Sequence, residues 1–161
     1  MTELHELHRI PEDAHYVLGF VFNSTLTDVL LVLKARPAWQ ADWLNGIGGR
    51  IEAGEDPRTA MSRTCRKECG LSVDPQAWHP LAAYYRPGTF LVHCYHVASP
   101  AIGEAKTVSD EPVVRQKVAD LMKLKVLPSV RWLVHLALDP GVVNKVLVQE
   151  QPRAIEKEAG T

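Results

Sequence analysis

Apolar and β-branched residues along the chain gather in short runs separated by turn residues, a pattern typical of strands joined by hairpins. Residues 15–22 and 29–34 are two such runs with polar turn residues between them, and they predict a hairpin. Residues 82–86 and 90–98 flank a Pro-Gly turn and predict two more strands. The chain therefore contains at least four segments suited to a sheet.

Helical spacing is found in two other segments. Residues 57–69 follow Asp56, a good N-cap, and end at Gly70, which suits the left-handed position after a helix. Residues 126–138 carry apolar side chains three and four positions apart, and they predict a helix that begins at Pro128. Strands, a helix, more strands and a late helix together predict an α/β fold with helices packed on a mixed sheet.

The length of 161 residues and the hydrophobic content of 46% suit one domain. We expect an N-terminal extension over residues 1–12, a single domain over 13–150, and a mobile polar tail over 151–161. Periodicity does not separate a helix from a strand in residues 142–148.

Charge and hydropathy exclude several classes of partner. The net charge is −1 and the chain has no basic run, so we expect no nucleic-acid partner. No apolar stretch approaches the roughly 20 residues that span a bilayer, and the polar N-terminus lacks a signal-peptide core, so we expect no membrane partner. Three cysteines without framework spacing fit a reducing compartment. A cytoplasmic protein is therefore expected.

The segment 49–71 carries a spaced motif of charged residues and glycines around the first predicted helix. It resembles the signature of the Nudix family of nucleoside diphosphate derivative hydrolases, which reads G, five residues, E, seven residues, then R-E-U-x-E-E-x-G-U, where U is apolar. The positions that match are Gly49, Glu55, Arg63, Cys65, Glu68, Gly70 and Leu71. Thr64 and Lys67 stand where the family has glutamates. The resemblance implies a Nudix-type α/β/α sandwich.

The resemblance also divides the motif into structural and chemical residues. In the family the early glutamate and the arginine form an ion pair, here Glu55 and Arg63, and the resemblance assigns them a structural role together with Gly49 and Gly70. The glutamates at positions 64, 67 and 68 hold magnesium in the family, because a hard cation needs several oxygen ligands. Only Glu68 of the three is present in this chain.

Other carboxylates are available to complete a metal site. Glu52 follows the double glycine, and Glu111 lies in the acidic segment 109–112, which resembles a family loop that supplies a further ligand or base. We expect Glu68 and Glu111 as catalytic candidates, and Glu68, Glu52, Glu111 and Gly48 as metal candidates. Solvated loop carboxylates are the alternative for Glu52 and Glu111.

Five residues are candidates for contact with a nucleotide, and each has a plain alternative. Tryptophan side chains offer faces on which a base can stack, but they also pack loops against a core. Asparagine can bind a base edge or form a turn. Cations can contact phosphate or lie exposed. The candidates are Trp39, Trp43, Asn45, Lys67 and Arg86.

Three functions follow from these observations and from the resemblance. The first is recognition of a nucleoside diphosphate derivative, with magnesium-dependent hydrolysis weak or lost. The second is an active pyrophosphohydrolase that uses Mg²⁺ or Mn²⁺ with Glu68 and either Glu52 or Glu111. The third is an interaction or regulatory module without a nucleotide and without a cofactor. Homodimers are common in the family, so a homodimer is an open alternative.

Overall fold

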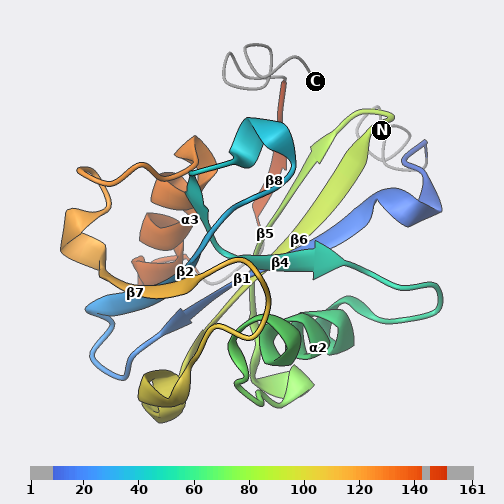
Figure 1. Cartoon of the computed structure of the whole chain (residues 1–161). Coiled ribbons are helices and arrows are strands. Elements are labelled where there is room, and N and C mark those ends of the chain that lie inside the picture. The colour runs from blue at the N-terminus through green and yellow to red at the C-terminus, as the bar shows by residue number, and fades with distance from the viewer. Residues whose placement is uncertain (1–8, 143–145, 152–161) are drawn as a thin grey trace.

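The computed structural model describes residues 9–142 and 146–151, which form one mixed sheet with two helices packed on it (Figure 1). The helices are α2 (Pro57–Cys69) and α3 (Pro128–Leu138). The strands are β1 (His15–Phe22), β2 (Asp28–Leu33), β3 (Leu44–Asn45), β4 (Ile47–Arg50), β5 (His79–Arg86), β6 (Phe90–Ala98), β7 (Val113–Lys117) and β8 (Val146–Gln149). Short 3-10 turns include η2 (Ala38–Gln40), between β2 and β3.

The eight-stranded sheet has the order β3-β2-β1-β6-β5-β8 along its main path. β4 also pairs with β1, and β7 also pairs with β2, so strands far apart in the sequence meet at the centre of the molecule. β1 is parallel to β6 and β5 is parallel to β8, whereas the other pairs are antiparallel. The predicted mixed sheet is confirmed.

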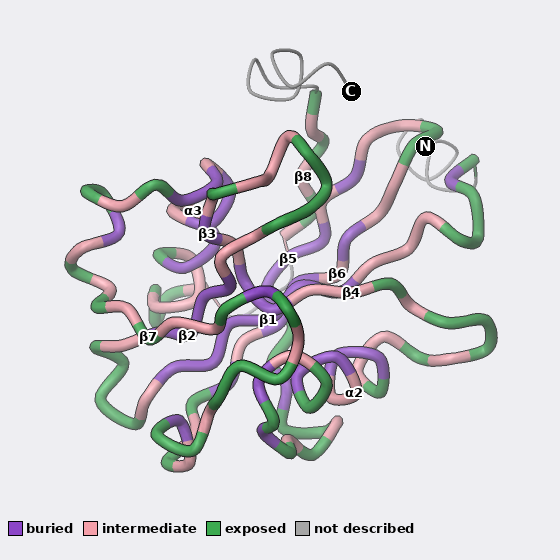
Figure 2. Tube along the Cα trace, viewed as in Figure 1, coloured by how far each residue is buried: buried purple, intermediate pink, exposed green. Residues whose placement is uncertain are grey.

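Two hydrophobic clusters lie on opposite faces of this sheet, one under each helix. Side chains of α3, including Leu133, join those of β1 and β2 in the first cluster. Met61 and Cys65 of α2 belong to the second, together with β1 side chains of the other face. Alternate residues of a strand point to opposite faces, which is why β1 is buried on both sides (Figure 2). The predicted α/β/α sandwich is confirmed.

Helix α2 begins and ends at the residues that the sequence predicts. The carboxylate of Asp56 accepts hydrogen bonds from the backbone N–H groups of Arg58 and Thr59. Gly70 closes the helix with a φ of 74°, a left-handed conformation that favours glycine. These two ends fix the direction in which the rest of the helix projects its side chains.

The other predicted elements agree with the structure to within a few residues. The predicted hairpin is present as β1 and β2, and the second helix begins at Pro128. β5 begins at His79 rather than at residue 82, because a bulge between Pro80 and Ala82 accommodates the proline within the strand. Residues 146–149 form a strand.

Parts of the sequence predictions fall outside the described residues or are not tested. Residues 143–145, inside the segment that fits a helix or a strand, lie outside the described part, as do residues 1–8 and 152–161 of the predicted extension and tail. The expected domain limits stay predictions. No helix within the described ranges is long and apolar enough to cross a membrane.

Candidate functional site

A cavity of about 590 Å³ lies between the central strands, the η2 turn and the start of α3. Strands β1 and β4 and the β5–β6 hairpin line it, and Glu150, directly after β8, also reaches it. A cavity of this volume is within the usual range for a small-molecule site.

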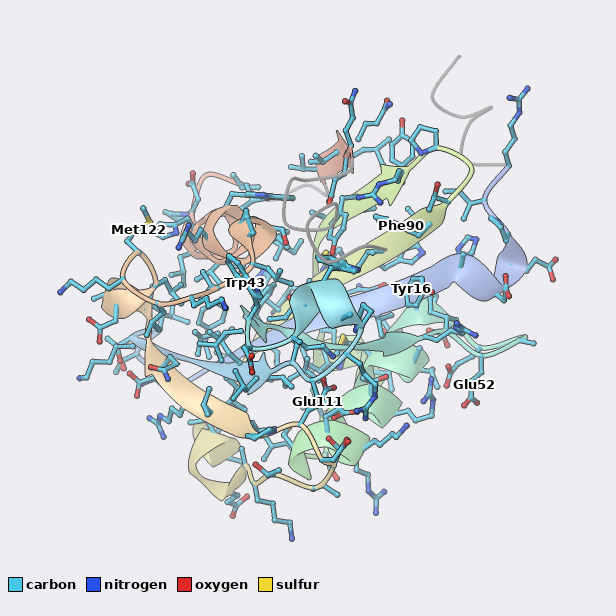
Figure 3. All side chains as sticks on the ribbon, turned by 45° about the horizontal axis from the view of Figure 1, so that its top comes forward. Tyr16, Trp43, Glu52, Phe90, Glu111 and Met122 are labelled. Atoms are coloured by element: carbon cyan, nitrogen blue, oxygen red, sulfur yellow. The ribbon has the colours of Figure 1, made fainter. Side chains whose placement is uncertain are left out.

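Aromatic side chains form much of the cavity wall. Tyr16 of β1 lies on the strand next to β6, which begins at Phe90, and Figure 3 labels both residues in this region. The rings of Tyr84 and Phe90 meet edge to face with centroids 6.2 Å apart. Trp39 of η2 contributes a fourth ring. These half-buried faces can stack on a flat heterocycle.

Three cations also line this cavity, each beside an aromatic or acidic neighbour. The guanidinium of Arg86 lies 4.9 Å from the centroid of the Phe90 ring, and its Nη2 lies 3.6 Å from Oε1 of Glu150. The guanidinium of Arg50 lies 5.8 Å from the Tyr16 ring centroid. Lys34, at the end of β2, is the third cation. The cavity therefore combines apolar faces with positive charge, which suits an aromatic anion.

The structure separates the five sequence candidates for nucleotide contact into two groups. Trp39, Asn45 and Arg86 line the cavity. Trp43 does not, and its ring lies 5.0 Å from Nζ of Lys125. Lys67 is exposed and lines a separate open groove of about 470 Å³ on the outer side of α2. Thr64, three residues before Lys67 on the same helix, is buried.

The Glu55–Arg63 ion pair connects the loop after β4 to helix α2. Nε and Nη2 of Arg63 each donate to a different Glu55 oxygen, both at 2.9 Å. Nη2 also donates to the backbone carbonyl of Arg50 at 2.9 Å. The hydrogen bond from Arg63 holds the pKa of Glu55 below its usual value despite partial burial. These contacts have the geometry expected of a structural ion pair.

Thr64 is buried against the double glycine. Its side chain is 2% exposed, and a Cβ added to Gly49 would lie only 2.8 Å from Thr64 Oγ1. Oγ1 has no hydrogen-bond partner among the described residues. A short neutral side chain thus fills the place where the family has a metal-binding glutamate.

Glu68 is bound to the acidic segment 109–112. Oγ of Ser109 donates to Oε2 of Glu68 at 2.6 Å. The same oxygen of Ser109 accepts from the backbone N–H of Glu111 at 3.2 Å. Glu68 is therefore an acceptor that holds the acidic segment on the last turns of α2.

Glu111 has three donors on the segment that follows β2. Lys34 Nζ lies 2.9 Å from Oε1, and the backbone N–H groups of Ala35 and Arg36 lie 2.6 and 3.4 Å from Oε2. The residue is 6% exposed. Burial alone would raise the pKa of Glu111, but the hydrogen bonds from Lys34 and Ala35 outweigh it and hold the pKa below its usual value.

These residues do not fit the magnesium site that the resemblance implies. The described residues contain no group of three or more histidine, cysteine or acidic side chains placed to hold one metal ion. Glu52 is 70% exposed beside Arg63, and Figure 3 shows it well away from Glu111. Glu111 is neutralised by Lys34. Glu68, Glu52 and Glu111 thus do not form the shared donor set that was expected, and Gly48 lines the cavity instead.

Several residues that line the cavity were not predicted from the sequence. Phe90 could have been found, because a hairpin turn after Arg86 brings Arg86 and Phe90 into register, as observed. Tyr16 and Arg50 lie on strands, and Lys34 directly follows one, whose pairing in the sheet depends on long-range contacts. The hydrophobic pattern of these segments does not indicate that they line one cavity.

Comparison with known proteins agrees with this architecture. The model of the NUDIX domain matches residues 14–136. A MutT structure from Bacillus halodurans is 15% identical with a TM-score of 0.64, and the alignment covers 86% of this chain and 90% of that one. A MutT NUDIX hydrolase from Burkholderia pseudomallei is 17% identical with a TM-score of 0.63, covering 76% and 96%.

A third structure comes from a study of MutT from Aliivibrio salmonicida and Vibrio cholerae. It is 21% identical with a TM-score of 0.61, and the alignment covers 75% of this chain and 95% of that chain. Identities this low establish the fold alone. No curated protein sequence matches the chain significantly.

Proposed function

Because the chain belongs to the NUDIX family, we propose that it binds a nucleoside diphosphate derivative and that its magnesium-dependent hydrolysis is weak or lost. The cavity carries the first half of this proposal. Its aromatic wall suits a base, and Arg50 supplies positive charge for a diphosphate, whereas Lys34 and Arg86 already have Glu111 and Glu150 as partners. Part of the ligand charge would thus be met by the Arg50 side chain.

The partners of the acidic side chains support the second half. Thr64 supplies no charge, Glu68 accepts from Ser109, and Glu111 is paired with Lys34. Glu111 could ligate a cation only if it gave up its ion pair with Lys34, which places a positive charge 2.9 Å from its Oε1. That rearrangement would weaken metal affinity by the free energy of the lost interactions.

Ligand binding is tested first, in the presence of a chelator. A panel of nucleoside di- and triphosphates, nucleotide sugars and dinucleotides is added to the protein, and thermal unfolding is followed. A ligand at 100 times its dissociation constant stabilises a protein by about 2.7 kcal/mol, which gives a clear rise in the midpoint. If no compound raises the midpoint, ligand recognition is contradicted and the interaction module remains.

Two tryptophans provide a matched pair of variants for placing the ligand. Trp39→Leu removes a cavity ring, and it should weaken binding about tenfold if the ring stacks on a base. Trp43→Leu removes the same side chain outside the cavity, and it should leave the affinity within twofold. Equal losses in the two variants would contradict the cavity as the binding site.

Hydrolysis is tested with the same panel and added Mg²⁺ or Mn²⁺. We expect little release of product from any compound. Fast turnover that is abolished by Glu68→Gln would overturn the second half of the proposal and establish the active pyrophosphohydrolase. It would leave ligand recognition intact.

A further inference from the structure

Two histidines lie side by side at the end of the β5–β6 hairpin that is remote from the cavity. His79 of β5 and His96 of β6 are direct partners in the antiparallel register. Their ring centroids are 5.3 Å apart and the ring planes are inclined by 33°. The cavity end of the same hairpin is the Arg86–Phe90 pair, about 23 Å away along β5 at about 3.3 Å per residue.

The separation of the two rings matches that of two imidazoles on one metal ion. A zinc–nitrogen bond is about 2.0 Å, and the ring centre lies about 1.2 Å behind the nitrogen. Two rings on a tetrahedral ion therefore have centroids about 5 Å apart. The observed 5.3 Å is close to this separation, and the site requires each ring to rotate until one of its nitrogens faces the ion. Backbone positions are already set by the paired strands.

The neutral form of His96 also favours metal binding. Burial, and then the nearby charge of His79, hold the pKa of His96 below its usual value. His96 is therefore neutral at pH 7, which is the form that ligates metals. His79 is exposed, so the pair is open to an ion from solvent.

From this geometry we propose that His79 and His96 form a site for a divalent transition-metal ion of the zinc and copper class. Imidazole nitrogens suit Zn²⁺, Cu²⁺ and Ni²⁺, whereas Mg²⁺ and Ca²⁺ select oxygen. Two protein ligands leave the remaining positions to water. The ion links β5 to β6 and is independent of the nucleotide proposed for the cavity.

The test is a calorimetric titration of the protein with Zn²⁺ after removal of any affinity tag and dialysis against a chelator. We expect one ion per chain, with His79→Ala and His96→Ala each lowering the affinity at least tenfold. His79 is exposed, so its substitution leaves the core intact. Adding Mg²⁺ in large excess should not displace the zinc.

Other histidines provide the controls. His93→Ala changes the ring that stacks on His15 at 6.4 Å, and a His5→Ala, His8→Ala double variant removes two histidines outside the described residues. Both controls should bind zinc within twofold of the parent. The proposal is overturned if no saturable binding occurs, if His79→Ala binds as tightly as the parent, or if either control loses the site.

Discussion

The charged residues in the two halves of motif 49–71 make different kinds of contact. In the first half Glu55 and Arg63 make a bidentate ion pair that also reaches the carbonyl of Arg50. In the second half Glu68 is kept, but its donor is Ser109 of the acidic segment. Glu55 and Arg63 thus make the ion pair that the resemblance implies, whereas Glu68 accepts a hydrogen bond from Ser109.

This difference teaches that a residue that matches the family motif does not by itself show that the chain has the family's function. A carboxylate is a metal ligand only where its oxygens are free to face an ion together with other oxygens. Glu111 illustrates the point, because Lys34 and two backbone N–H groups already occupy its oxygens. The ion pair of Glu55 and Arg63 does not depend on whether Glu68 binds a metal ion.

Breaking the ion pair should have the largest effect on stability. Arg63→Met leaves the Glu55 carboxylate, whose side chain is 13% exposed, without its guanidinium partner. We expect a loss of about 3 kcal/mol of unfolding free energy, toward the lower limit for a broken buried pair because Arg63 itself is partly exposed. Urea unfolding measures it. Arg66→Met on the same helix is the control and should change stability by less than about 0.5 kcal/mol.

Restoring the family glutamate at position 64 should have the next largest effect. Thr64→Glu places a carboxylate in a position that is 2% exposed against Gly49, and we expect a loss of about 2 kcal/mol without metal. Adding Lys67→Glu should create magnesium affinity that recovers part of this loss. If unfolding of the double variant is unchanged by magnesium, position 64 does not face the metal site of the family.

Much of the fold could be predicted because its signals are local. Asp56 and Gly70 mark the ends of α2 by backbone chemistry alone, and β1 reads as a strand from its own residues. β3, β4 and β7 were not predicted as strands. The glycines before Arg50 lower strand propensity, and β4 exists because it pairs with β1.

The candidate site was less predictable, because it depends on which elements meet. Trp39 and Trp43 are equivalent in the sequence, yet only Trp39 lines the cavity. The contact between Lys34 and Glu111 joins residues 77 positions apart, so no local pattern indicates it. Glu111 was therefore expected at a metal site.

Acidification should remove the stability that the ionised carboxylate of Glu111 contributes, which is a moderate effect. The hydrogen bonds to Glu111 outweigh its burial and hold its folded pKa below the ordinary 4.5, so its ionised form stabilises the protein fully above that pH. This contribution is lost as the pH falls through the lower, folded pKa. Glu111→Gln should cost about 1.5 kcal/mol at pH 7 and progressively less below pH 4.5.

Glu55→Gln is the comparison within motif 49–71, because the hydrogen bond from Arg63 also lowers the pKa of Glu55. Both variants should lose less stability on acidification than the parent, measured by urea unfolding between pH 3 and 7. A difference between Glu111→Gln and the parent that stays constant over this range would contradict an ionised, paired Glu111.

The smallest effect should come from the contact between Ser109 and Glu68. Ser109→Ala removes a hydrogen bond of 2.6 Å to a half-buried carboxylate, and we expect a loss of about 1 kcal/mol. Glu68→Ala should cost about as much, and the double variant should cost less than the sum, because both changes remove one contact. Nucleotide affinity in chelator should stay within twofold in all three variants. Additive losses would mean that Glu68 stabilises the protein through some other partner. The contact between Ser109 and Glu68 would then not explain the role of Glu68.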